Sequence, residues 1–203
     1  MEKETFEKES GENRNEEGTL VQSEQSQKTS MKQELFEWVQ AIVIALVIAL
    51  VIRTFVFSLI KVNGQSMLPT LHHDDRLVVV KLMYEPKQGD IIILNPPDKQ
   101  KGPFVKRIIA TSGQNVDIDY EKHKVYVDGE VLQEDYVNEL VMQRGDIQFP
   151  VTVPEDHVFV LGDNRNNSRD SRYSDVGMIP YQFIIGKVTL KIWPLHKFGS
   201  VYE

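Results

Sequence analysis

The pattern of hydrophobic and polar positions divides the chain into three parts. Residues 1–34 are rich in Glu, Lys, Ser, Gln and Asn, and Phe6 is their one aromatic residue. Such a segment cannot bury enough apolar surface to offset the entropy cost of ordering, so we expect a disordered, acidic tail. A regulatory role for this tail stays open.

An apolar run follows the tail. Residues 41–52 are all apolar, and flanking apolar residues extend the run to Leu35 and Ile60. A bilayer is spanned by about 20 helical residues, so the run predicts a transmembrane anchor over residues 35–60. A cleavable secretory signal is the alternative, but the leader is long and acidic and no small-residue cleavage site follows. Lysine and arginine flank both ends of the run, so charge does not fix its orientation.

Residues 61–203 have a sequence pattern typical of β-strands. Short runs of β-branched and aromatic residues alternate with turn signals such as Asp128-Gly129. No stretch of about twelve residues has helical periodicity. We therefore predict a mainly β fold, an antiparallel β-sandwich or barrel tethered by one N-terminal transmembrane helix. The predicted strands cover residues 76–83, 90–95, 104–110, 115–120, 124–132, 157–163 and 187–193.

Composition removes several classes of chemistry. The chain has no cysteine, which excludes disulfides, a thiol nucleophile and cysteine-ligated metals. The net charge is −7 and no block is strongly basic, so we expect no nucleic-acid partner. Residues 72–75, His-His-Asp-Asp, are metal-ligating types, but adjacent residues on one turn rarely converge on one ion. We predict no metal site and no cofactor.

Ser66 is a candidate nucleophile. It lies in NGQSMLPTL, residues 63–71, where Gly64 and Pro69 favour a sharp turn that leaves the serine amide exposed. Alone, such a turn is a weak signal, and a serine nucleophile also needs a base. The histidines permit a Ser-His-Asp arrangement, although none lies in a recognisable motif.

Lysine is the other candidate base, because burial lowers the pKa of an ammonium group. In FVKRIIA, residues 104–110, strand alternation places Lys106 on a face with apolar residues. Lys81 and Lys191 have similar settings, and each of the three could instead be an edge-strand lysine that discourages aggregation. Sequence physics alone does not choose among them.

The segment GDNRNNSRDSR, residues 162–172, follows a predicted strand and is dense in polar groups. A plain surface loop is one interpretation. However, Asp163, Arg165, Asp170 and Arg172 alternate in sign, which favours a loop held in one shape by ion pairs.

Together these segments resemble the bacterial type I signal peptidases, membrane-anchored Ser/Lys proteases, in their Gram-positive form. The resemblance implies that Ser66 attacks the scissile carbonyl, that neutral Lys106 takes its proton and that Ser168 orients Lys106. It also implies that the loop ion pairs of Asp163, Arg165, Asp170 and Arg172 stabilise the site. The motifs that carry the resemblance cover residues 36–193 in the family's order: the anchor, SMLPTL (66–71), GDIIIL (89–94), FVKRIIA (104–110), GDNRNNSRDSR (162–172) and GMIP with Gly186-Lys187.

The resemblance further implies an architecture, a substrate and a location. Residues 61–203 would form an extracytoplasmic, largely antiparallel catalytic domain with a small inserted β subdomain at about 111–158. An apolar rim near Met67 would touch the lipid bilayer, and residues 1–34 would be cytoplasmic. The substrate would be a signal-peptide-bearing preprotein, cut after small residues at −1 and −3 that fill shallow pockets. The expected contributors to these pockets are Val62, Met67, Phe104 and Val105.

One position departs from the family pattern. Some members carry a serine two residues before the nucleophile as a second oxyanion donor, and here that residue is Gly64. We expect Gly64→Ser to be tolerated and Gly64→Val to obstruct the substrate.

Two alternatives to a signal peptidase remain. One is a membrane-tethered β module with a degenerate site, which the joint presence of Ser66, Lys106 and Ser168 disfavours. The other is a self-cleaving Ser/Lys regulator, a class that is generally soluble and carries a DNA-binding region.

Overall fold

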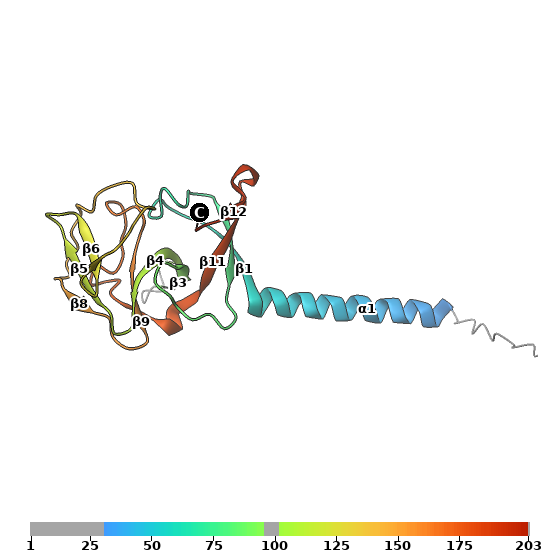
Figure 1. Cartoon of the computed structure of the whole chain (residues 1–203). Coiled ribbons are helices and arrows are strands. Elements are labelled where there is room, and N and C mark those ends of the chain that lie inside the picture. Colours follow the sequence, from blue (N-terminus) through green and yellow to red (C-terminus); the bar gives the residue numbers. More distant parts are fainter. Residues whose placement is uncertain (1–30, 96–101, 203) are drawn as a thin grey trace, which may run out of the picture. The chain divides into compact units, whose positions relative to one another are not determined.

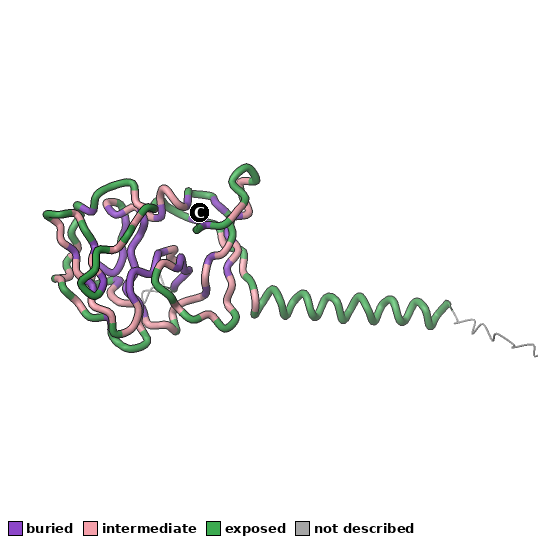
Figure 2. Tube along the Cα trace, viewed as in Figure 1, coloured by how far each residue is buried: buried purple, intermediate pink, exposed green. Residues whose placement is uncertain are grey.

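The computed structural model describes residues 31–95 and 102–202. The predicted tail therefore lies outside the described residues, except at its last positions, which are helical. Helix α1, Met31–Val51, continues as a π-helical turn, η1, over Ile52–Val56. Within the described ranges, this is the one helix that is long and apolar enough to cross a membrane. None of its residues is buried by protein (Figure 2), so its apolar surface is free to face lipid.

The helix ends earlier than the anchor predicted over residues 35–60. Residues Phe57–Lys61 form strand β1, which pairs antiparallel with β2, Arg76–Val80. Phe57 lies opposite Val80 and Lys61 lies opposite Arg76. The sequence FSLIK is apolar enough to resemble the end of an anchor, but pairing with a neighbouring strand stabilises the extended conformation instead.

The residues from Phe57 to Tyr202, here called the β domain, contain two antiparallel sheets (Figure 1). The larger sheet has the order β1-β2-β11-β3-β4-β9-β10, with β12 paired to β11. Its remaining strands are β3 (Ile91–Leu94), β4 (Phe104–Thr111), β9 (His157–Leu161), β10 (Ile179–Pro180), β11 (Ile184–Trp193) and β12 (Gly199–Ser200). Two short 3₁₀ turns, η3 (Tyr181–Phe183) and η4 (Leu195–Lys197), flank β11.

The smaller sheet lies between β4 and β9 in the sequence, although those two strands pair with each other. Its order is β7-β6-β5-β8, with β5 at Asn115–Asp119, β6 at Lys124–Val127, β7 at Glu130–Val131 and β8 at Val151–Thr152. The turn from β6 to β7 is Asp128-Gly129, where φ is 52° and 84°. Positive φ at both central positions is what a two-residue hairpin turn requires, and it suits Asp-Gly.

The two sheets share part of their core. One buried cluster joins Ile109 and Phe159 of the larger sheet to Val116 and Val125 of the smaller one. Figure 2 shows buried residues throughout the interior of the β domain. The small sheet is therefore fixed by apolar contacts to the strands that carry the candidate site.

The predicted fold class, mainly antiparallel β with one apolar N-terminal helix, is confirmed. Every predicted strand has a counterpart, and the run over 124–132 is a hairpin of two strands. The strands that sequence analysis missed, apart from β1, are the two-residue strands β8, β10 and β12. Such strands are too short to show alternation.

Candidate active site

Ser66 lies in the segment that joins β1 to β2. Turn hydrogen bonds from Leu68 N to Gln65 O, 3.2 Å, and from Leu71 N to Met67 O, 2.8 Å, curl the backbone around it. Met67 and Leu71 are fully buried in the core beneath, whereas Ser66 is half-buried. The two apolar neighbours thus anchor the turn and leave the serine at the surface.

Lys106 of β4 faces Ser66. Its Nζ lies 2.8 Å from Ser66 Oγ and 3.1 Å from the carbonyl oxygen of Val105. The side chain is 3% exposed, and Nζ stands 5.4 Å from the ring centre of Phe104. An ammonium group in this apolar setting has lost most of its hydration.

Burial lowers the pKa of Lys106 to about 8 from the ordinary lysine value of 10.5. The carboxylates of Asp170 and Asp163 oppose this shift, and the guanidinium of Arg172 adds to it. Desolvation is the largest cause, and within the described residues Lys106 has no ion-pair partner to offset it. At pH 7, one unit below this pKa, about a tenth of Lys106 is neutral, far more than for an ordinary lysine.

The other two candidate lysines have different surroundings. Lys191 is also buried, but it lies 3.0 Å from the Asp75 carboxylate and donates to the carbonyl oxygen of Thr70. Lys81 is partly exposed and donates to the carbonyl oxygen of Thr54. The structure therefore separates the three lysines that sequence analysis left equivalent, and only Lys106 meets a hydroxyl.

Ser168 is buried in the loop that follows β9, and its Oγ has no hydrogen-bond partner among the described residues. Gly162 separates it from the Ser66 turn. A Cβ built on Gly162 would lie 2.2 Å from Ser168 Oγ and 2.5 Å from the carbonyl oxygen of Ser66. Only glycine permits this close approach of the two loops. The expected hydrogen bond from Ser168 to Lys106 is not formed in this structure.

The charged residues of the 162–172 loop pair mostly outside it. Asp170 accepts from Arg172 Nε at 2.8 Å, and this is the internal pair. Asp163 instead accepts from Arg107 Nε, 2.8 Å, and from the hydroxyl of Thr70, 2.6 Å. All four side chains of these two ion pairs, Arg107–Asp163 and Arg172–Asp170, are nearly inaccessible to water, so each charge is compensated by its buried partner.

Arg165 completes the buried network through a partner that sequence analysis missed. Its guanidinium holds Glu134, from the segment between β7 and β8, in a bidentate pair. Arg107, which pairs with Asp163, was missed as well. Arg107 follows Lys106 on the same strand, and neighbouring side chains of a strand point to opposite faces. The sequence could therefore have indicated that Arg107 lies on the other face of the sheet from Lys106. Glu134 offers no comparable signal, since it lies 31 residues from Arg165.

The residues expected to line the −1 and −3 pockets are not equally accessible. Val62 and Met67 are 3% and 1% exposed and belong to the same core cluster, whereas Phe104 and Val105 are half-buried. Met67 itself is buried and supports the Ser66 turn from below, and the expected apolar rim near it stays a prediction. Exposed apolar side chains of the β domain include Leu59, Trp193, Leu195 and Phe198.

Gly64 has a φ of +107°, and a Cβ at this position would have no atom within 4 Å. Any L-residue is strained at this φ, which argues against the expected tolerance of Gly64→Ser. The expected obstruction of the substrate by Gly64→Val stays a prediction. The Gly64 amide donates to His73 Nδ1 at 3.2 Å. Asp74 and Asp75 of the same His-His-Asp-Asp run pair with Lys61 and Lys191.

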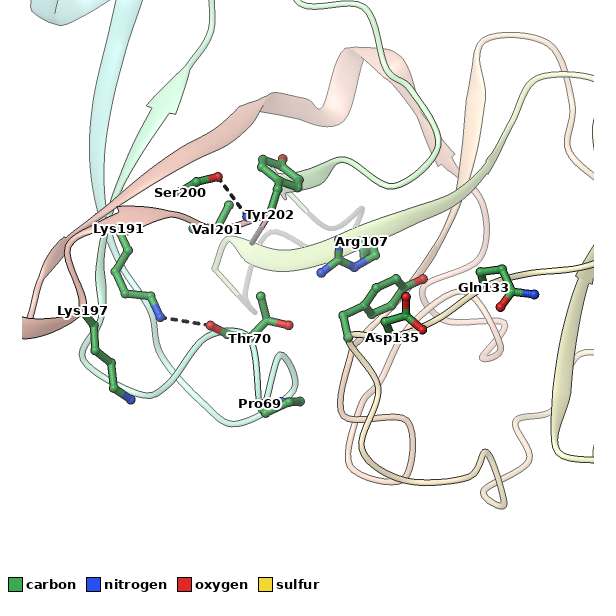
Figure 3. Close-up of a pocket in the computed structure, with 11 residues that line it drawn as sticks. Pro69, Thr70, Arg107, Gln133, Asp135, Lys191, Lys197, Ser200, Val201 and Tyr202 are labelled. Carbon is green, nitrogen blue, oxygen red and sulfur yellow. Dashed lines mark hydrogen bonds between the residues drawn. The ribbon is translucent and has the colours of Figure 1, made fainter.

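A cavity of about 650 Å³ borders the Pro69-Thr70 segment (Figure 3), and neither Ser66 nor Lys106 lines it. Its wall includes Arg107, Lys191 and Tyr202, and Figure 3 shows Lys191 reaching Thr70. A smaller cavity, about 250 Å³, borders Leu68, Asp163 and Asn164 and therefore lies next to the Ser66 turn.

On an antiparallel β domain, a serine hydroxyl thus faces a buried lysine that has no ionic partner within the described residues. Comparison with known proteins identifies a family of peptidases. A family model described as signal peptidase, peptidase S26, matches residues 35–193. The chain belongs to this family and is a hydrolase, as the resemblance in its motifs indicated.

Individual relatives cover most of the chain. Signal peptidase I of Leptolyngbya laminosa is 39% identical over 178 residues, which are 82% of this chain and 84% of that protein. Signal peptidase I S of Bacillus subtilis (strain 168) is 38% identical over 183 residues, 85% of this chain and 96% of that protein. The crystal structure of a signal peptidase I from Enterococcus faecalis V583 is 32% identical, covers 52% of this chain and 98% of that chain, and has a TM-score of 0.43.

Proposed function

We propose that the chain is a membrane-bound serine endopeptidase that removes N-terminal signal peptides from preproteins, with Ser66 as nucleophile and Lys106 as general base. The observation that carries the proposal is the 2.8 Å separation of Lys106 Nζ and Ser66 Oγ at a lysine whose pKa is lowered to about 8. A neutral amine at this distance can accept the hydroxyl proton. The names of the relatives, signal peptidase I, support the substrate class.

The chemistry follows from these two groups. As Ser66 Oγ attacks the scissile carbonyl carbon, its proton passes to Lys106 Nζ and the carbonyl oxygen becomes an oxyanion. The ammonium then returns that proton to the departing amine, which is the new N-terminus of the mature protein. Neutral Lys106 next takes a proton from water as the water oxygen attacks the Ser66 ester. The ammonium gives that proton to Ser66 Oγ as the ester bond breaks, and the signal peptide leaves with a free carboxylate.

The Ser66 amide is the proposed oxyanion donor. Within the described part of the chain this N–H makes no hydrogen bond, whereas the Ser66 carbonyl accepts from Asn164 N at 3.0 Å. That bond orients the peptide group beside the nucleophile. Ser168, whose buried Oγ has no partner here, is the proposed orienting group for Lys106 once bound substrate excludes water.

The proposed substrate is the extended segment after the apolar core of a signal peptide. Small residues at −1 and −3 would fill shallow pockets to which half-buried Phe104 and Val105 contribute, with Val62 and Met67 forming their floor. The proposed organisation is a tail that ends before Met31, an anchor within Met31–Val56 and a catalytic domain from Phe57 onward with an insert at about 111–158. The tail would be cytoplasmic and the catalytic domain extracytoplasmic.

The test is cleavage of a model preprotein by the full-length protein in detergent. We expect one cut after a small residue, and no cut when the residue at −1 is changed to Trp. Ser66→Ala and Lys106→Arg should each lower kcat by about 10²- to 10⁴-fold, because guanidinium does not deprotonate in proteins. Lys81→Arg is the matched control and should stay active. Substantial activity of Lys106→Arg would mean that the base is another residue.

The pH dependence gives a second arm of the same test. Protonation removes the basic form of Lys106, so the wild-type rate should fall as pH decreases through about 8. A midpoint near the ordinary lysine value of 10.5 would contradict the assignment of this buried group as the base.

A further inference from the structure

The segment between β7 and β8, residues 133–147 and here called the strap, runs along the 162–172 loop. The Asn166 side chain of the loop makes four hydrogen bonds to the strap. Its Oδ1 accepts from Met142 N at 2.9 Å and Gln143 N at 3.1 Å, and its Nδ2 donates to the carbonyl oxygen of Leu140 at 3.0 Å and to Glu139 Oε2 at 3.2 Å. Arg172 donates to the carbonyl oxygen of Gln143 at 2.8 Å. The strap and the loop are therefore joined along much of their length.

Glu134 makes the strap's most buried contact with the loop. Its two carboxylate oxygens hold the guanidinium of Arg165, whose side chain is 1% exposed. The hydroxyl of Tyr136 donates to the same carboxylate at 3.1 Å, and the Tyr136 ring lies 3.8 Å from the guanidinium carbon of Arg107. Within the described residues, Glu134 is the one ion-pair partner of Arg165. Without it, a buried positive charge would be left uncompensated.

Arg165 connects this pair to the backbone of Gly162. Arg165 Nε donates to the Gly162 carbonyl oxygen at 3.0 Å, while Gly162 N donates to Asp170 Oδ2 at 3.1 Å. Both polar backbone groups of Gly162 are thus fixed by buried, charged side chains. Asp170 is neutralised inside the loop by Arg172, but Arg165 depends on the strap.

Gly162 is where the two halves of the candidate site touch. The Gly162 Cα lies so close to Ser168 Oγ and to the carbonyl oxygen of Ser66 that a Cβ on it would collide with both atoms. A displacement of Gly162 would therefore change the position of Ser168 relative to Ser66 and to Lys106, which lies 2.8 Å from Ser66 Oγ. Misplacement of reacting groups by about 1 Å can lower a rate by roughly 100-fold.

We propose that Glu134 is a positioning residue for the peptidase reaction: it compensates Arg165, and Arg165 in turn fixes Gly162 between Ser66 and Ser168. Glu134 is not a catalytic residue, because its carboxylate is occupied by Arg165 and Tyr136 and has no free oxygen to offer a substrate. This inference rests on the proposed function.

The test compares Glu134→Gln with Asp146→Asn in the full-length protein. Asp146 also joins the strap to the chain beyond the loop, since it accepts from Ser174 N at 2.6 Å and from Ser174 Oγ at 2.7 Å. That contact is exposed and does not reach Gly162. The control therefore removes a carboxylate of the strap that binds a neutral serine instead of the buried Arg165. For each variant, kcat and KM are measured on a model preprotein, and kcat is expressed per folded molecule from near-ultraviolet circular dichroism.

We expect Glu134→Gln to lower kcat by roughly 10- to 100-fold, with KM changed by less than about threefold. Asp146→Asn should leave both unchanged. If Glu134→Gln does not fold, Glu134→Asp replaces it, because the shorter carboxylate keeps the charge but not the bidentate geometry, and its kcat should fall by about threefold or more.

Two outcomes would overturn the proposal. One is a kcat per folded molecule within about twofold of wild type for the Glu134 variant. The other is an equal loss of kcat in the Glu134 and Asp146 variants, which would make the strap a general stabiliser. Failure of the proposed function is a separate result: wild type would not cleave, or Ser66→Ala would cleave as well as wild type, before any Glu134 variant is compared.

Discussion

At the scale of the residue, burial of Lys106 disfavours its charged form, and this loss of hydration destabilises the folded state. The pKa of Lys106 is lowered from 10.5 to about 8, so the folded protein binds fewer protons than the unfolded chain between these two values. The destabilisation is therefore fully present below pH 8 and disappears as pH rises through 10.5. A difference of this size corresponds to about 3 kcal/mol.

Lys106→Met should consequently stabilise the protein while abolishing cleavage. At pH 7 we expect the free energy of unfolding to rise by up to about 3 kcal/mol. The contribution of the two hydrogen bonds that Lys106 Nζ makes is lost and reduces this gain. The gain should shrink as pH rises from 8 to 10.5. Denaturant titrations of both proteins in one detergent at several pH values measure the difference. Lys124→Met, at an exposed lysine, is the control, and a gain of the same size there would contradict the argument.

Gly162 gives a second prediction at this scale. Gly162→Ala should remove activity and destabilise the β domain, because the methyl group would meet Ser168 Oγ at 2.2 Å and the Ser66 carbonyl oxygen at 2.5 Å. Overpacking of this kind costs about 1–3 kcal/mol. Gly199→Ala adds the same methyl group where nothing lies within 4 Å, so it should behave like wild type. Cleavage rates and thermal unfolding of the two variants check this prediction. An active Gly162→Ala would show that the Ser66 turn and the 162–172 loop can move apart without loss of activity.

The same residues show what sequence reasoning can and cannot supply. The Ser66 turn and the apolar strand around Lys106 are local patterns, so both groups were identified as candidates from the sequence. The choice of Lys106 over Lys191 depends on whether a carboxylate reaches the buried amine, and Asp75 lies far from Lys191 in sequence. The ion pairs of Arg107 and Arg165 also join distant segments, and alternation of charge within one loop does not reveal them.

At the scale of the element, the strands with clear alternation were predicted with near-correct limits, because a two-residue period persists whatever the strand pairs with. β1 was missed for the opposite reason. FSLIK continues the apolar run of the anchor, and only its pairing with β2 separates the strand from the helix. The strap lacks regular structure, so its alignment with the loop had no periodic signal.

Phe159 of β9 tests how firmly the small sheet is joined to the large one. Its fully buried ring meets Phe149 edge-on, with centroids 5.9 Å apart, inside the cluster that both sheets share. Phe159→Ala should lower the free energy of unfolding by about 3–5 kcal/mol in a single transition. Leu140→Ala, at a leucine that is 63% exposed, should change it by less than about 0.5 kcal/mol. Two separate transitions in the Phe159 variant would indicate that the sheets unfold independently.

At the scale of the whole molecule, the candidate spanning helix of the described residues would place the chain before it and the chain after it in different compartments if it crosses the bilayer. The proposed extracytoplasmic catalytic domain implies a cytoplasmic tail, and basic residues near both ends of the helix do not decide between the two orientations. The absence of cysteine makes a direct measurement simple, since any introduced thiol is unique.

Ser10→Cys in the tail and Glu155→Cys at an exposed position of the β domain should react differently with a membrane-impermeant maleimide. In intact cells stripped of their wall we expect labelling of Glu155→Cys alone, because the reagent reaches only the outer face. After detergent permeabilisation both should be labelled, which controls for thiol reactivity. Cleavage of the model preprotein by both variants shows that the folded enzyme is being probed. Labelling of Ser10→Cys and protection of Glu155→Cys in intact cells would reverse the proposed orientation and place the Ser66–Lys106 pair in the cytoplasm.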